Sequence, residues 1–150
     1  MIEPFIERFT NLISQIHNLV NEIFPNQDLK IGYLTVFAQS KDSYNSFRSV
    51  LSKYGNECEA NNGFKYVLDK PLDILGEHIE VIRVRNPDVH RTELGCCDLI
   101  YKEGDYDFYR DKALETGLDI ILRKGYEMIE LSTPDIPVYA YMVKETQLVK

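Results

Sequence analysis

The sequence predicts an α+β fold in which an N-terminal amphipathic helix precedes two βαβββ modules that form a mostly antiparallel sheet. Three observations predict this fold. Apolar residues recur every three or four positions through residues 3–24, which is typical of a helix with one buried side. A strand, a helix and further strands follow in residues 31–84, joined by short links that favour antiparallel neighbours. After Gly95 the same order of elements recurs.

The first helix is predicted over Glu3–Phe24, with Pro4 tolerated in its first turn and Pro25 ending it. Its apolar stripe consists of Phe5, Ile6, Phe9, Leu12, Ile13, Ile16, Leu19, Val20 and Ile23. This stripe either covers a sheet of its own domain or binds a partner, and we favour the first interpretation. His17 falls between stripe positions, which favours a solvated side chain over a ligand.

The first module is predicted over residues 30–86. Its elements are a strand at Ile31–Ala38, a helix at Ser40–Tyr54, a strand at Phe64–Leu68 and a strand at His78–Val84. Strict alternation in this last strand and just beyond it gives two faces. One face carries Ile79, Val81, Arg83 and Arg85, and the other carries His78, Glu80, Ile82 and Val84. On this pattern both arginines point away from Glu80.

The second module is predicted over residues 93–144. Its elements are a strand at Gly95–Tyr101, a helix at Tyr106–Thr116 and strands at Leu118–Arg123, Tyr126–Leu131 and Pro137–Val143. Alternation in its first strand puts Cys96 and Asp98 on the face opposite Cys97 and Leu99. The two modules can be aligned by matching residues 32–36 with 95–99 and residues 79–81 with 129–131.

Composition limits the classes of protein that the chain can represent. With 150 residues, 44% of them hydrophobic, residues 1–150 are expected to form a single domain. A net charge of −7 argues against a nucleic-acid partner. No apolar run is long enough to span a membrane, and no basic leader opens the chain. Three cysteines, Cys58, Cys96 and Cys97, without C-x-x-C spacing, favour a reduced, cytoplasmic location.

Residues 31–143 resemble the vicinal oxygen chelate superfamily of glyoxalases and extradiol dioxygenases, and within it the YecM-like branch. The resemblance is carried by the paired modules, the Asn-Gly turn at residues 62–63 and the charged strand before the second module. It implies a cupped sheet around a divalent metal, which would be Zn, Fe, Mn or Ni. Glu80 and Glu130 match the family's glutamate positions, whereas its histidine positions fall on Tyr33 and Cys96. The resemblance therefore implies a metal site with an altered ligand set.

The candidate site collects polar side chains that a cupped sheet would turn inward. The metal ligands to test are His78, Glu80, Asp98 and Glu130. The substrate-binding candidates are Tyr33 and Tyr126. Glu80 and Glu130 are also the catalytic candidates, because two close carboxylates can share a proton and act as general acid and base. Without a metal, buried carboxylates need other partners, and the candidates are Arg83, Arg85, Arg91 and Arg123. A structural ion pair at a strand edge is the third interpretation of the two glutamates.

These features predict a small-molecule-binding protein of vicinal oxygen chelate type. As an enzyme it would be a divalent-metal-dependent lyase, isomerase or dioxygenase-like protein, and otherwise it would have no cofactor. The alternative is a non-catalytic structural or interaction protein that forms a homodimer through the N-terminal stripe or a sheet edge. The sequence contains no glycine-rich phosphate loop after a strand and no G-x-S-x-G or H-E-x-x-H motif, so those chemistries find no support.

Overall fold

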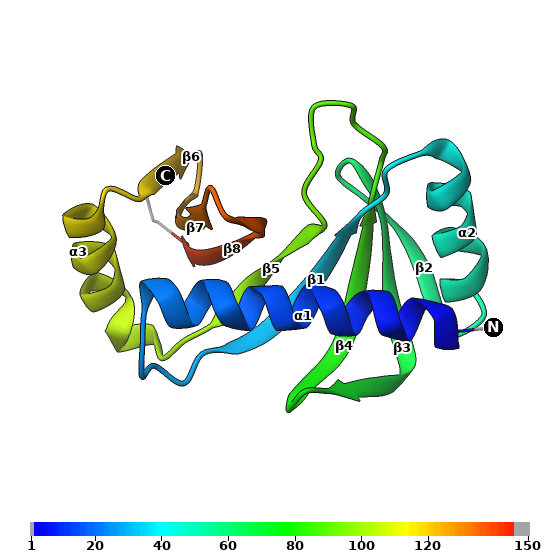
Figure 1. The fold of residues 1–150 in the computed structure, drawn as a ribbon, viewed down its shortest axis with the longest axis horizontal. Helices are drawn as coiled ribbons and strands as arrows, with labels where there is room; N and C mark the ends of the chain where they lie inside the picture. Colours follow the sequence, from blue (N-terminus) through cyan, green and yellow to red (C-terminus); the bar gives the residue numbers. More distant parts are fainter. Residues whose placement is uncertain (1, 146–150) are drawn as a thin grey trace.

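A computed structural model describes residues 2–145 and contains both predicted modules (Figure 1). The helices are α1 (Glu3–Ile23), α2 (Lys41–Leu51) and α3 (Tyr106–Thr116), with a 3-10 turn η1 at Glu103–Asp105. The strands are β1 (Lys30–Phe37), β2 (Gly55–Ala60), β3 (Gly63–Ile74), β4 (Glu77–Arg85), β5 (Gly95–Ile100), β6 (Asp119–Arg123), β7 (Tyr126–Thr133) and β8 (Ile136–Glu145). Each module has the predicted order of one strand, one helix and three strands.

The eight strands form one mixed sheet in the order β2-β3-β4-β1-β5-β8-β7-β6. β1 pairs in parallel with β4, and β5 with β8, while all other neighbours are antiparallel. The two modules meet at the centre, where β1 pairs with β5. The predicted α+β class is therefore confirmed, and the sheet is not closed into a barrel.

One side of the sheet, which we call the helix face, is covered by α1. Figure 1 shows α1 running across both modules, with α2 near its first turn and α3 near its last. Aromatic rings join these helices, since the Phe5 and Phe47 centroids are 4.8 Å apart and those of Phe24 and Tyr109 are 5.0 Å apart. The buried residues of α1 are Phe9, Leu12, Ile13, Ile16, Leu19 and Val20. The stripe thus covers its own domain, as predicted, and it is not free to form a homodimer interface. Within residues 2–145, no helix is long and apolar enough to cross a membrane.

A hydrogen bond between His17 and the buried Glu77 also ties α1 to the sheet. His17 Nε2 lies 2.7 Å from Glu77 Oε2, and the Glu77 side chain is only 4% exposed. The other carboxylate oxygen of Glu77 accepts a hydrogen bond from the Ile31 backbone N–H at 2.9 Å. A buried carboxylate is costly without such partners. The prediction that His17 is a merely solvated side chain is therefore wrong.

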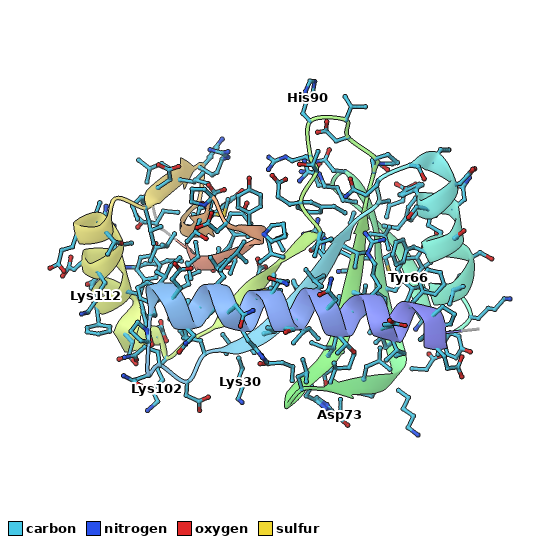
Figure 2. The ribbon with its side chains drawn as sticks, viewed as in Figure 1. Lys30, Tyr66, Asp73, His90, Lys102 and Lys112 are labelled. Atoms are coloured by element: carbon cyan, nitrogen blue, oxygen red, sulfur yellow. The ribbon has the colours of Figure 1, made fainter. Side chains whose placement is uncertain are left out.

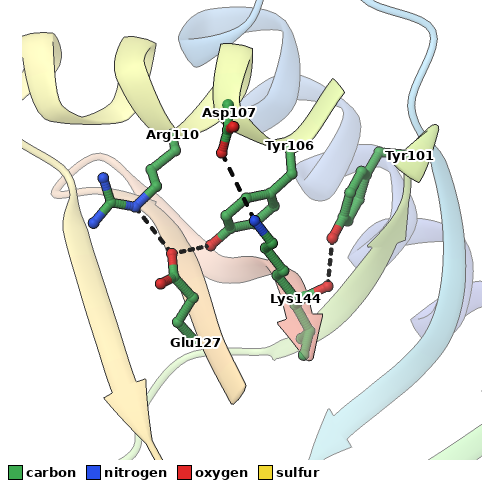
Figure 3. A network of polar contacts seen from close by, with 7 residues as sticks. Tyr101, Tyr106, Asp107, Arg110, Glu127 and Lys144 are labelled. Atoms are coloured by element: carbon green, nitrogen blue, oxygen red, sulfur yellow. Dashed lines mark hydrogen bonds and ion pairs between the residues drawn. The ribbon is translucent and has the colours of Figure 1, made fainter. Parts of the chain in front are cut away.

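Polar contacts hold α3 against β7 and β8 (Figure 3). Glu127 Oε2 accepts hydrogen bonds from the Tyr106 hydroxyl and from Arg110 Nε, both at 2.9 Å. Lys144 Nζ lies 3.8 Å from Asp107 Oδ1. Burial raises the pKa of the Tyr106 hydroxyl, so this group remains a hydrogen-bond donor at neutral pH. These contacts belong to the helix side of the sheet and leave its other side open.

The strict alternation predicted for β4 is interrupted at Glu80 and Val81. The register of pairing with β3 shifts at this point. Ile79 and Ile82 are both buried on the helix face, and neither of the two residues between them is buried there. The shift turns Arg83 and Arg85 to the side opposite the helices, which we call the open face. The prediction that these arginines point away from Glu80 is wrong, because a bulge changes which residues share a face.

The predicted match between residues 79–81 and 129–131, which made Glu80 and Glu130 equivalent, is wrong. Glu80 lies on β4, the last strand of the first module, whereas Glu130 lies on β7, the third strand of the second. The counterpart of β4 is β8, because each is the parallel neighbour of its module's first strand. Glu80 and Glu130 therefore do not occupy equivalent positions.

Candidate functional site

The open face carries a cavity of about 640 Å³, the main cavity, to which both modules contribute. Its floor is formed by the central strands, with Thr35 on β1, Asp98 on β5 and Tyr141 on β8. One wall is built around the β2–β3 turn at residues 61–62, and the opposite wall around the β6–β7 turn at residues 124–125. A cavity of this size is typical of small-molecule sites.

Cationic side chains dominate the walls of the main cavity. They are Arg83, Arg85, Arg91, Arg123 and Lys124. Within residues 2–145 none of the five lies in an ion pair. The anionic side chains that line the same cavity are Asp98, Glu130 and Glu145. The main cavity is therefore positively charged in a chain whose net charge is −7.

Arginines elsewhere in the chain have partners. Arg48 donates to Glu57 Oε1 from Nε and Nη2, at 3.1 and 2.6 Å. Arg110 is paired with Glu127 (Figure 3), and Arg8 Nη2 donates to the Phe37 carbonyl at 3.1 Å. Outside the main cavity, Arg48 and Arg110 each pair with a carboxylate and Arg8 donates to a backbone carbonyl, whereas no arginine of the main cavity pairs with a carboxylate within residues 2–145.

Asp98 is a buried acidic group on the cavity floor. Burial raises the pKa of its carboxyl, and the positive charge of Arg83 opposes that rise in part. No side-chain hydrogen bond to Asp98 is found within residues 2–145, so its oxygens are available to a ligand. Burial also raises the pKa of the neighbouring Cys96 thiol to about 11, although its hydrogen bond with Thr35 acts in the opposite direction. Cys96 therefore stays protonated and is a poor nucleophile.

Two tyrosines of β8 organise carboxylates around this floor. The Tyr141 hydroxyl donates to Glu130 Oε2 at 2.9 Å, and the Tyr139 hydroxyl donates to Glu93 Oε2 at 3.2 Å. Burial, followed by the charge of Glu130, raises the pKa of Tyr141. The guanidinium of Arg91 lies over the Tyr139 ring, 5.8 Å from its centroid. Tyr141 thus holds Glu130 in place at the edge of the cavity.

A second cavity of about 370 Å³ lies on the open face and contains the other predicted residues, Tyr33, His78 and Glu80. His78 Nδ1 lies 2.8 Å from Asp73 Oδ1 and its Nε2 lies 3.7 Å from Glu80 Oε1. The hydrogen bond to Asp73 raises the pKa of His78. These side chains are 60%, 80% and 67% exposed for His78, Asp73 and Glu80, as expected for surface pairs of low energy. Figure 2 shows Asp73 at the end of the sheet opposite the loop that carries His90.

The predicted site residues therefore separate into two groups. Asp98, Tyr126 and Glu130 line the main cavity, Tyr33, His78 and Glu80 line the second, and only Asp98 touches both. Within residues 2–145, no three His, Cys, Asp or Glu side chains are close enough to hold one metal ion. The predicted ligand set is not assembled, and the cationic wall beside Asp98 does not suit a divalent metal. The alternative partners considered for these carboxylates, Arg83, Arg85, Arg91 and Arg123, line the main cavity but form no ion pair with them within residues 2–145.

No family model and no curated protein matches the chain. A structural-genomics target, protein EC4020, superposes with a TM-score of 0.65 at 12% identity, over 95% of this chain and 89% of that one. The two proteins share a fold. At this identity the likeness extends to the fold alone.

Weaker structural neighbours include two proteins of the vicinal oxygen chelate superfamily. A methylmalonyl-CoA epimerase in complex with methylmalonyl-CoA and NH4⁺ has a TM-score of 0.43 and 13% identity, over 81% of this chain and 97% of that one. The fosfomycin resistance protein FosX from Listeria monocytogenes has a TM-score of 0.26 and 10% identity, over 77% and 90%.

Proposed function

We propose that the main cavity binds a small anionic organic molecule and that Asp98 exchanges a proton with it, in an isomerase-type or lyase-type reaction. The observation that carries this proposal is the group of unpaired arginines around one cavity of an acidic chain. Assignment to the YecM-like branch of the vicinal oxygen chelate superfamily is retained as part of the proposal. So is a cytoplasmic location, which suits the free thiols of Cys58, Cys96 and Cys97.

Electrostatics favours an anion as the ligand. Unpaired guanidinium groups repel one another, and the chain has 24 acidic residues with which to neutralise them. Arg48 and Arg110, outside the cavity, are neutralised in this way, whereas the arginines that line the cavity have no carboxylate partner within residues 2–145. A guanidinium offers a planar set of donors that matches a carboxylate or a phosphate in two-point contact. A ligand that supplied these groups would remove the repulsion and gain charge-assisted hydrogen bonds.

The floor supplies acid–base chemistry without a metal. A carboxyl with a raised pKa retains its proton to higher pH and can also accept one from a bound molecule. Arg83 and Arg85 would hold the negative charge that develops on a ligand when a proton leaves a neighbouring carbon. Because the donors do not fit a divalent metal, no step of the proposed reaction involves one.

Binding can be tested with a panel of small carboxylates and with inorganic phosphate, by measuring shifts of the melting temperature. The informative variant is Arg83→Gln combined with Arg85→Gln. Its control is Lys102→Gln, an exposed residue away from the cavity, which changes net charge in the same direction. We expect at least one anion to raise the melting temperature of the wild type and the control, and to lose at least tenfold in affinity in the double variant. Equal shifts in all three proteins would contradict the proposal.

Proton transfer can be tested on any ligand found in this way. Exchange of its carbon-bound hydrogen for solvent deuterium, followed by NMR, should occur with the wild type. It should fall by at least tenfold in Asp98→Asn, with binding retained. Exchange at the wild-type rate in this variant would remove Asp98 from the mechanism.

A non-catalytic protein that forms a homodimer is the second candidate, but its interface could not be the buried stripe of α1. A sheet edge at β2 or β6 remains the surface for it. Sedimentation of the purified protein at several concentrations tests whether a dimer forms.

A further inference from the structure

Four of the five cationic side chains of the main cavity come from the two modules and stand on opposite walls, while Arg91 lies in the loop between β4 and β5. Arg83 and Arg85 extend from β4 in the first module, and Arg83 Nη2 also donates to the Asn61 carbonyl in the β2–β3 turn at 3.3 Å. Arg123 and Lys124 stand at the β6–β7 turn of the second module. The β2–β3 and β6–β7 turns occupy equivalent positions in the two modules. The cavity thus has two cationic side chains at each end, Arg83 and Arg85 at one and Arg123 and Lys124 at the other.

The sheet keeps these two groups apart. Strands β1, β5 and β8 lie between β4 and β7. Neighbouring strands are about 4.8 Å apart, so β4 and β7 are separated by roughly 19 Å measured along the sheet, and curvature of the sheet shortens the direct path. A single carboxylate group cannot contact both walls at once.

The floor between the walls carries no cationic side chain. It presents Thr35, Cys96, Met128 and Tyr141, together with the acidic side chains of Asp98 and of Glu130, which accepts a hydrogen bond from Tyr141. The thiol is neutral because its pKa is raised by burial. An uncharged middle section of a ligand would therefore lie over the strands, where Asp98 can reach it.

We infer that the ligand of the main cavity is an elongated organic molecule with an acidic group at each end, one held by Arg83 and Arg85 and the other by Arg123 and Lys124. This inference rests on the proposed function, since it assumes that the cavity binds an anion. It adds the substrate class: a dicarboxylate, or a carboxylate with a phosphate or phosphonate at its far end. The central carbons of such a molecule would be the ones presented to Asp98.

The test compares α,ω-dicarboxylates of increasing chain length with monocarboxylates of the same length. Dissociation constants are measured by NMR titration of the full-length protein. Malonate has the charge of its longer relatives but cannot span the walls, so it controls for charge alone. We expect affinity to rise with length to an optimum, at which the dicarboxylate binds at least tenfold more tightly than both malonate and the matched monocarboxylate. Dissociation constants of carboxylates that carry a phosphonate at the other end, at the optimal length, then show whether Arg123 and Lys124 prefer a carboxylate or a phosphonate.

Substitutions on one wall test which cationic side chains bind each end of the ligand. Arg123→Gln combined with Lys124→Gln should remove the advantage of the dicarboxylate while the monocarboxylate still binds at Arg83 and Arg85. The Lys102→Gln control should keep the advantage. If mono- and dicarboxylates bind with equal affinity at every length, the inference of an acidic group at each end of the ligand is wrong, while the proposal that the cavity binds an anion is retained. If neither class binds, the proposed function fails together with the inference.

Discussion

The two faces of the sheet differ although the same strands form both. On β8 the side chains toward the helices, Val138, Ala140 and Met142, are all buried, while Tyr139 and Tyr141 face the main cavity or its edge. The arginines of the two faces also differ in their partners. Arg110 on the helix face pairs with Glu127, whereas Arg83 on the open face has no ion pair within residues 2–145. One face thus supplies the free energy of folding and the other is available for binding, so substitutions on the two faces should have separable effects.

Deleting residues 1–25 should have the largest effect on the helix face. The deletion removes the buried stripe and the partner of Glu77, and each large apolar side chain contributes roughly 1.5–3 kcal/mol when buried. The summed loss exceeds a typical domain stability of about 5–15 kcal/mol. We expect no cooperative thermal unfolding by circular dichroism. A melt within a few degrees of the full-length protein would show that α1 does not stabilise the sheet.

Gly95→Ala should have a smaller effect, on the same face. A Cβ at this buried position would overlap the Thr35 carbonyl oxygen and lie 3.0 Å from Leu12 Cδ2. Because backbone atoms cannot move aside cheaply, we expect the free energy of unfolding in urea to fall by about 1–3 kcal/mol or more. The control is Gly104→Ala in η1, where a Cβ meets no atom within 4 Å. Equal stability of both variants would mean that α1 and β5 are packed less closely than described.

Asp98→Asn should have the smallest effect on stability, and its sign depends on pH. Because burial raises the folded pKa of Asp98 above the unfolded value of about 3.9, the folded state is favoured by protonation, and stability is lost as pH rises through the folded pKa. We expect the variant to be more stable than the wild type near neutral pH and the difference to shrink on acidification. Urea unfolding at several pH values, with the exposed Asp111→Asn as control, measures this. A difference that grows toward acid would contradict the burial of Asp98.

Local periodicity was enough to predict most of the fold. The stripe of α1 and the helix at Tyr106–Thr116 follow from spacing and from end signals such as Gly117, which adopts a φ of 79°. The repeat order followed from the same local signals. β2, with the sequence GNECEA, could not be located because an exposed edge strand has no apolar alternation.

The site could be predicted only in part, because it depends on register and on distant contacts. Asp98 and Glu130 were placed on the correct face by alternation, since β5 and β7 are regular there. Arg83 lines the main cavity and Glu80 does not, because pairing with β3 shifts the register of β4, which no local pattern in β4 reveals. His17 and Glu77 are far apart in the sequence, so their buried contact had no local signal.

The packing of α1 also sets the order in which the core can form during synthesis. The helix is translated before the strands, yet its contacts include β5, β7 and β8, and β8 ends only at Glu145. Until those strands emerge, the apolar stripe of the nascent chain has only part of its final surface to cover. Contacts between such distant segments slow folding and leave hydrophobic surface exposed to aggregation in the meantime. Because α1 packs on strands of both modules, we expect the core to be completed only after the second module has been made, and the two repeats to unfold as one cooperative unit.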